Sequence, residues 1–385
     1  MKHHLRIGHT FSTTAAFAFV LCGTIFAQEA GPIVIGQRLK IHSTILNEDR
    51  MLWIYNPDTA RTSTMRYPVI YLLDGEAHFI HTTGIVQFLA EVGRMPEMVV
   101  VGIESTNRMR DFTPQPADKS VPFSGSAETF LRFVKDELIP FVDANYRTAP
   151  FRVLVGHSIG GTFALHTFLT RPEVFNSYML ISPNLWWGND TLVSQLDAFL
   201  KKPPTLKALV YETHTVWESP RQMTTLPRVL NLIETYKVEG LDWKVKIMQE
   251  ETHASIVHRS SIDGLEFVYS HWAITADPVA TGWAGLQRHF KELSDRYGYQ
   301  IDPPESMVNS LGYQYLFQNK LDVAIPIFQF NVQHHPNSWN VYDSLGEAYA
   351  TKGDIKLAIE NYEKSIALNP SNKEGIETLR KLKAK

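Results

Sequence analysis

The segment Arg152–Thr162, RVLVGHSIGGT, decides the fold expected for this chain. Its first four residues are apolar or amphipathic without alternation, as in a strand that is covered on both faces. Gly-x-Ser-x-Gly follows at residues 156–160, and the apolar residues after Thr162 recur at helical intervals. The sequence therefore predicts a nucleophile elbow, a sharp strand-to-helix turn with Ser158 exposed at its tip.

The glycines of this motif have a steric role. An elbow holds its serine in a strained backbone conformation, and strand and helix pass so close that the residues two before and two after the serine must be small. The free N–H groups at the start of the helix, with that of Ile159 first, can stabilise a developing oxyanion. We expect Ser158 to be a nucleophile and the Ile159 N–H to be an oxyanion donor.

Length and composition narrow the class of protein. A chain of 385 residues predicts more than one domain, and 44% hydrophobic with 20% charged residues is ordinary for globular proteins. A net charge of -3 without a basic stripe argues against a nucleic-acid partner. The spacing of histidines and carboxylates contains no His-x-x-x-His pair or acidic cluster, so no metal site is expected.

The N-terminal stretch has the features of a secretory signal peptide. Lys2 and Arg6 precede an apolar run over residues 15–26, and Ala27 ends it. The run is too short to span a bilayer, so we expect cleavage after Ala27 and no transmembrane segment in the mature chain. The only cysteine, Cys22, lies within the removed part, and lipid attachment there is disfavoured by the bulky residue before it. A mature chain without disulfides points to a bacterial periplasmic or secreted protein.

The order of apolar segments predicts an α/β fold. Short buried strands alternate with helical patterns, and an antiparallel pair is expected over residues 33–55. This is the pattern of a doubly wound, mostly parallel sheet, in which functional residues gather at the carboxyl ends of the strands. The strands are expected at residues 69–73, 98–103, 152–155, 178–181, 209–211 and 245–248.

The C-terminal part repeats itself with an offset of 34 residues. Leu311-Gly312 recurs as Leu345-Gly346, and the same offset relates three further pairs. The spacing and residue types are those of tetratricopeptide helix-turn-helix repeats, so an all-α region is expected, packed on the preceding domain or on a helix near residues 283–297. The expected domains are a signal peptide at 1–27, a hydrolase domain at 33–275, a helical linker at 276–302 and a repeat region at 303–385.

A serine nucleophile needs a base, and the base needs an acid that orients it. His253 follows the strand that ends near residue 248 and is the expected base. For the acid, Glu218 lies in the loop after the preceding strand, while Glu212 ends that strand and Asp242 precedes the next. The sequence leaves these three acids open, and a Ser-His dyad as well.

Other candidate site residues lie at expected strand ends. Gly75 and Glu76 follow an early strand, and the N–H of Glu76 is the expected second oxyanion donor. Trp186 and Trp187 could form an aromatic wall for an aryl or sugar group, with core packing as the alternative. Arg110 could attract an anionic substrate, or it could form a structural ion pair with the neighbouring aspartate.

Several of these segments together resemble the esterase family that includes the ferric-siderophore esterases. The resemblance spans residues 33–273, and it implies an α/β-hydrolase fold, hydrolysis of carboxylic esters and no cofactor. It also implies Ser158 as nucleophile, His253 as base, and the N–H groups of Glu76 and Ile159 as oxyanion donors. Asn184 departs from the serine that family members often have. The segments are YPVIYLLDGEAHF (67–79), VVGIESTNRMRDFTP (100–114), VGHSIGG (155–161), SPNLWW (182–187) and the His253 loop.

Two functional hypotheses follow from the sequence. The first is an exported serine esterase that acts through an acyl-enzyme on siderophore-type, aryl or sugar esters. The second is a catalytically weak hydrolase domain that serves a tetratricopeptide protein-interaction module. A small-molecule ester is the expected partner in the first case, and a protein bound by the repeats in the second.

Overall fold

The computed structural model describes residues 31–57, 65–114, 123–205, 207–274 and 281–384. Residues 1–34 and 35–385 are separate units, and the second contains all the elements considered below. The expected signal peptide and Cys22 lie outside the described residues, so both stay predictions. None of the described helices is both long and apolar enough to cross a bilayer.

A single eight-stranded sheet is the framework of the domain, in the order β1-β2-β4-β3-β5-β6-β7-β8. β2 is antiparallel to β1 and β4, and the other neighbours are parallel, which confirms the doubly wound, mostly parallel α/β fold. The strands are β1 Gln37–Ser43, β2 Glu48–Tyr55, β3 Tyr67–Leu73, β4 Val99–Ile103, β5 Thr148–His157, β6 Ser177–Ile181, β7 Ala208–Thr215 and β8 Leu241–Met248.

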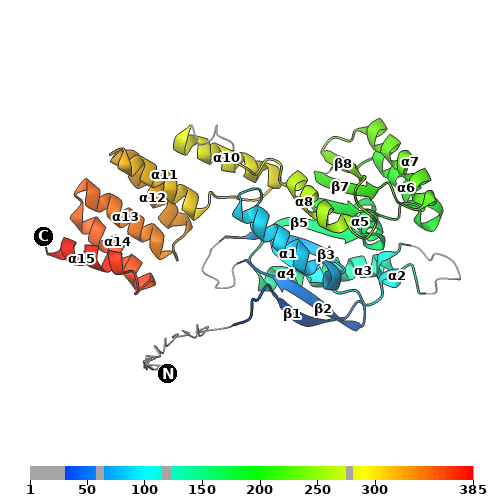
Figure 1. Ribbon diagram of the computed structural model, residues 1–385, viewed down its shortest axis with the longest axis horizontal. Helices are drawn as coiled ribbons and strands as arrows, with labels where there is room; N and C mark the ends of the chain where they lie inside the picture. The colour runs from blue at the N-terminus through cyan, green and yellow to red at the C-terminus, as the bar shows by residue number, and fades with distance from the viewer. Residues whose placement is uncertain (1–30, 58–64, 115–122, 206, 275–280, 385) are drawn as a thin grey trace, which may run out of the picture. The chain divides into compact units, whose positions relative to one another are not determined.

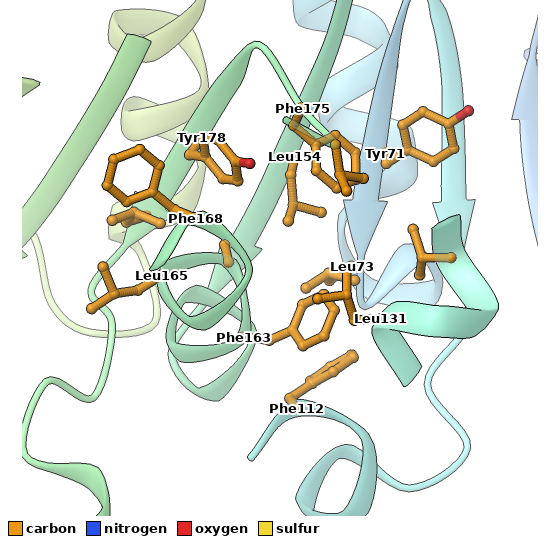
Figure 2. Close-up of a cluster of buried hydrophobic side chains, with 14 of the residues drawn as sticks. Tyr71, Leu73, Phe112, Leu131, Leu154, Phe163, Leu165, Phe168, Phe175 and Tyr178 are labelled. Carbon is orange, nitrogen blue, oxygen red and sulfur yellow. The ribbon is translucent and has the colours of Figure 1, made fainter. Parts of the chain in front are cut away.

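Alternate side chains of the buried strands enter two separate cores, one on each face of the sheet. Tyr71 and Leu73 belong to the core beneath α3 to α7, whereas Ile70 and Leu72 belong to the core beneath α1, α8 and α10. Figure 2 shows the first core, where Phe163 and Phe168 of α5 lie against the strands. The helices of this part are α1 Gly75–Glu91, α2 Arg108–Phe112, α3 Ala127–Phe133, the π-helical η1 Val134–Leu138, α4 Ile139–Asn145, α5 Ile159–Thr170, α6 Trp187–Lys201, α7 Pro220–Tyr236, α8 Ile256–Val268 and α10 Gly282–Tyr297 (Figure 1).

The sheet reverses its winding direction between β3 and β5. The chain passes from β3 to β4 on one side, crosses back to β5, and then continues through β6, β7 and β8 on the other side. Such a reversal leaves a crevice at the carboxyl ends of the two strands, because their following loops turn apart. Gly75 follows β3 and Ser158 follows β5, so both expected site segments lie at this crevice.

Five further helices complete the described chain, and their packing confirms the predicted repeats. Gly312 and Gly346 occupy equivalent positions, and a Cβ on either would lie 2.6 Å from Phe328 or 3.0 Å from Tyr362 of the paired helix. Small residues are therefore needed where the helices of each pair approach. The helices are α11 Glu305–Phe317, α12 Leu321–His334, α13 Trp339–Lys352, α14 Ile355–Leu368 and α15 Lys373–Lys383.

α10 contacts both the α/β part and the first repeat. The Tyr297 hydroxyl donates a hydrogen bond of 3.0 Å to the Val268 carbonyl, and Trp283 packs edge-on against Phe330 of α12 at 4.9 Å between ring centroids. This agrees with the expectation that two repeats need a supporting helix. The domain boundaries at residues 275 and 302 stay predictions.

Candidate active site

Ser158 lies at the turn between β5 and α5 with an unusual backbone conformation. Its φ is 58° and its ψ is -120°, a region that non-glycine residues rarely adopt. Two backbone hydrogen bonds hold it there: Ser158 N–H donates to Ile181 O at 2.8 Å, and Thr162 N–H donates to Ser158 O at 3.0 Å. The surrounding strand and helix therefore impose the strained conformation, as an elbow requires.

The steric need for glycine differs between the two flanking positions of the motif. A Cβ on Gly156 would lie 2.2 Å from the Gly160 carbonyl oxygen, and one on Gly161 would lie 3.1 Å from the Gly156 oxygen. A Cβ on Gly160, two residues after the serine, would meet its nearest neighbour at 3.5 Å, which is ordinary contact. Residue 160 therefore need not be glycine, but the side chains of Leu73 and Asp74 lie within 3.6 Å of this Cβ, so it must be small, as expected.

This difference makes a matched pair of substitutions. We expect Gly156→Ala to lower the free energy of unfolding by about 3 kcal/mol, because backbone atoms cannot yield to the added methyl group. Gly160→Ala adds the same methyl group inside a helix and should stay within about 1 kcal/mol of the wild type. Urea unfolding measures both, and equal losses for the two variants would contradict the close approach at Gly156.

Loops after β7 and β8 bring an acid and a histidine together. Nδ1 of His253 lies 3.3 Å from Oε2 of Glu218, whose side chain is 7% exposed. Glu212 is fully buried, and its carboxylate pairs instead with His214 at 2.7 Å. Asp242 stands at the start of β8, at the opposite edge of the sheet from the crevice. Among the described residues, Glu218 is thus the one of the three candidate acids that contacts His253.

The surroundings of Glu218 favour its ionised form. Burial by itself would raise the pKa of this carboxyl. Hydrogen bonds from His253 and Ser182 and the positive charge of a protonated His253 outweigh burial, so the pKa of Glu218 is lowered. An ionised carboxylate can accept a hydrogen bond from the Nδ1–H group of His253 and hold the imidazole in one tautomer.

Ser158 and His253 are joined indirectly. Within the described residues, no hydrogen bond links the Ser158 hydroxyl to the His253 ring. His157 connects the two, since its Nε2 lies 2.8 Å from the His253 carbonyl oxygen and its ring centroid lies 4.8 Å from that of His253. Hydrogen bonds between a nucleophile and its base are often long without substrate, so this arrangement is compatible with general-base chemistry.

Two helix starts present free backbone N–H groups at the crevice. In α1 the first N–H groups to reach a helical acceptor are those of Ala77 and His78, which donate to Asp74 O, so Gly75 and Glu76 precede the internal bonding pattern. Ile159 holds the same place at the start of α5. The two expected oxyanion donors therefore come from the segments after β3 and β5. The Glu76 side chain turns to the Ser105 N–H at 3.1 Å.

Gly75 is required for close packing. A Cβ at this position would lie 2.6 Å from the carbonyl carbon of Gly102 in β4. Asp74, just before it, receives hydrogen bonds from Arg108 and Ser105 at 2.7 Å and 2.5 Å. These contacts hold the start of α1 against β4, and they place the Glu76 N–H through the backbone alone.

The expected substrate role of Arg110 is not supported by its contacts. Its guanidinium binds both carboxylate oxygens of Glu48, at 2.6 and 3.0 Å, and Oδ1 of Asp111 at 2.7 Å. Asp111 also pairs with the buried Arg50 at 2.6 Å. The ion-pair alternative therefore describes Arg110, because two carboxylates already occupy the nitrogens that an anionic substrate would need.

The two adjacent tryptophans differ in exposure. Trp187 is 6% exposed and packs in the core, whereas Trp186 is half-buried and lies under the guanidinium of Arg221, 5.1 Å from the ring centroid. Trp217, next to Glu218 in the acid loop, is 72% exposed. The sequence interpretation passed over Trp217 and Arg221, and their only signal was an aromatic and a cation close to the expected acid.

A row of histidines borders the crevice on the α1 side. The rings of His157 and His78 lie 5.8 Å apart, and those of His78 and His81 lie 5.3 Å apart. Burial, followed by the charge of His253, lowers the pKa of His157 to about 4, and burial with the neighbouring histidines lowers the pKa of His81 to about 4. These side chains are neutral at neutral pH. No group of three or more His, Cys, Asp or Glu in the described ranges is arranged to hold a metal ion.

Ser182 is a further site residue that the sequence interpretation missed. It follows β6 directly, its side chain is buried, and its hydroxyl lies between Glu218 and His253. The available signal was its position, since a polar residue at the carboxyl end of a parallel strand is a candidate for the site.

Two segments of the chain match known protein families. Residues 43–223 match the family described as "Putative esterase", and residues 340–372 match a tetratricopeptide repeat. The ferri-bacillibactin esterase of Bacillus subtilis is 34% identical over 179 residues, 40% of this chain and 61% of that protein. The siderophore triacetylfusarinine C esterase of Aspergillus fumigatus is 29% identical over 161 residues, 39% of this chain and 55% of that protein. The chain thus matches 55% to 61% of the length of these two relatives.

Solved structures give the same fold. An IroE-like serine hydrolase from Shewanella oneidensis superposes with a TM-score of 0.68 and 27% identity, covering 78% of this chain and 99% of that one. The BES protein from Bacillus cereus superposes with a TM-score of 0.57 and 25% identity, covering 63% of this chain and 99% of that one. The expected resemblance and fold class are confirmed.

Proposed function

We propose, from the premise that residues 43–223 belong to the esterase family, that this chain is an exported serine hydrolase of carboxylic esters. The observation that carries the proposal is the strained Ser158 at the turn between β5 and α5. The Glu218–His253 pair supports it, because both residues come from loops at the carboxyl ends of neighbouring parallel strands. A nucleophile, a base with its acid, and oxyanion donors are the parts that acyl transfer needs.

The proposed reaction has two steps. The Ser158 hydroxyl oxygen attacks the ester carbonyl carbon while Nε2 of His253 takes its proton, and the N–H groups of Glu76 and Ile159 stabilise the oxyanion. His253 then gives the proton to the departing alkoxide, which leaves an acyl group on Ser158. Water attacks this acyl group with His253 again as base, releasing the carboxylic acid and restoring the serine. Glu218 keeps the imidazole oriented and stabilises its charged form.

For the substrate we propose a siderophore-type, aryl or sugar ester. The half-buried Trp186 with Arg221, together with the exposed Trp217, offers rings and a cation near the acid loop. Aromatic and sugar groups stack on such side chains. The two relatives described above are named a ferri-bacillibactin esterase and a siderophore triacetylfusarinine C esterase, which supports including that class in the proposal.

Two measurements test the proposed function. A fluorophosphonate probe is expected to label the protein once, on the tryptic peptide that contains Ser158, because the probe reacts with activated serines. Hydrolysis of p-nitrophenyl acetate should be lost on labelling, and a panel of trilactone, feruloyl and acetyl-sugar esters then ranks the substrates. An unlabelled Ser158 in a protein that still hydrolyses the acetate would reject the proposed mechanism.

Export and partner binding extend the proposal. The basic and apolar stretch before Ala27 supports export, and N-terminal sequencing of the protein from the producing cell checks for a mature chain that begins at Gln28. The tetratricopeptide match supports a protein partner for the repeats.

A further inference from the structure

Ser182 occupies a constrained place at the carboxyl end of β6. It is 1% exposed, and its φ of 48° lies in the left-handed region that disfavours residues with a side chain. Its N–H donates to Thr213 O at 2.7 Å, which ties the residue to the neighbouring strand β7. A buried, strained serine at the edge of a candidate active site needs an explanation beyond packing.

The hydroxyl of Ser182 contacts both partners of the acid–base pair. It bonds Oε1 of Glu218, and its oxygen lies 3.1 Å from Nδ1 of His253. A carboxylate only accepts hydrogen bonds, so the Ser182 hydroxyl proton points to Glu218. The lone pairs of the same oxygen then face Nδ1, and the Nδ1 proton is shared between Ser182 Oγ and Glu218 Oε2.

This sharing compensates for a loose direct contact. The Glu218–His253 distance of 3.3 Å exceeds the 2.7–2.9 Å usual for a charge-assisted N–H to carboxylate bond. Ser182 supplies a second acceptor for the same proton at a shorter distance. With the proton kept on Nδ1, the lone pair of Nε2 is left for the nucleophile.

The loop that carries Ser182 is held from two sides. Gln222, 2% exposed, donates to Pro183 O at 2.8 Å and accepts from the Leu185 N–H at 3.1 Å. The Asn184 N–H donates to the Thr162 hydroxyl at 3.0 Å. These three hydrogen bonds hold residues 183–185, so the backbone next to Ser182 is fixed by contacts that do not involve Glu218 or His253.

We propose that Ser182 is a positioning residue that completes the acid side of the site, linking Glu218 to His253 through its hydroxyl. The inference rests on the proposed function, since it assigns Ser182 a part in the orientation of the base. It predicts that the effect of Ser182 on turnover depends on Glu218. A serine that only stabilises the loop would act independently of Glu218.

A double-mutant cycle on the full chain tests this with p-nitrophenyl acetate. Ser182→Ala and Ser182→Gly are each expected to lower kcat about 10-fold with KM within about two-fold, because the base loses an acceptor. In a Glu218→Ala background the Ser182→Ala change should lower kcat less than about two-fold. Ser182→Gly also relieves the positive φ, so it keeps the test valid if the alanine variant folds poorly.

Ser260→Ala is the matched control. Ser260 is also fully buried, and its hydroxyl pairs with the Thr213 hydroxyl of β7 at 2.8 Å. Its removal should lower the thermal midpoint without changing kcat. A Ser182→Gly kcat within two-fold of the wild type, or an undiminished Ser182→Ala loss in the Glu218→Ala background, overturns the inference.

Two further measurements distinguish a failure of this inference from a failure of the proposed function. Turnover that persists in Ser158→Ala contradicts the serine mechanism, whereas Ser158-dependent turnover with unaffected Ser182 variants contradicts only the role of Ser182. Proton NMR gives a readout without turnover: the low-field His253 Nδ1 proton, assigned by its loss in His253→Ala, should broaden in both Ser182 variants. An unchanged resonance overturns the inference.

Discussion

Replacing Ser158 by alanine is expected to lower kcat for p-nitrophenyl acetate by at least about 10³-fold, because the proposed acyl intermediate forms on the Ser158 oxygen. The fold should persist, since the hydroxyl is absent from the backbone bonds that hold the elbow. Steady-state kinetics with the wild type and the variant at equal concentration measure the loss.

The strain at Ser158 provides the control for this variant. Its φ of 58° and ψ of -120° suit glycine better than alanine. Ser158→Gly should therefore be as inactive as Ser158→Ala, yet more stable than it by about 1 kcal/mol in urea unfolding. Residual activity in both variants would mean that the ester is cleaved elsewhere on the chain.

Glu218→Gln is expected to lower kcat by about 10²- to 10⁴-fold. The loss is largest if the wrong tautomer of His253 becomes the dominant one. The amide keeps the size of the carboxyl group but can donate a proton towards Nδ1 of His253. KM should change little, because Glu218 is 7% exposed and contacts the base. Initial-rate kinetics over a range of substrate concentrations separate the two constants.

Glu212→Gln and Asp242→Asn are the matched controls for the acid. Glu212 bonds His214 and Trp243 in the interior, so its change should reduce stability and leave kcat within a few-fold. Asp242 lies at the amino end of β8, away from the site, so its change should affect neither stability nor kcat. If either control lost more kcat than Glu218→Gln, the acid would be the residue changed in that control.

The elements that were predicted correctly are those whose information is local. The sharp turn at residue 158 could be predicted because the strand, the turn and the helix of an elbow are contiguous over residues 152–170. The repeats were found for the same reason, since a 34-residue offset is visible along the chain. That Gly156 has no room for a methyl group while Gly160 has could not be predicted, because local patterns do not show in which direction a Cβ points.

By itself, the sequence determined the α/β class, the tetratricopeptide region and the candidate nucleophile of this protein, because periodicity and motif spacing are properties of neighbouring residues. Three contacts became visible only in the tertiary structure. They are the contact of Glu218 with His253, the salt bridge between Glu48 and Arg110, and the position of the Ser182 hydroxyl between acid and base. These contacts join residues 35 to 71 positions apart. The physical reason is that parallel strands bring their following loops to one edge of the sheet, and the strand order sets which loops are neighbours.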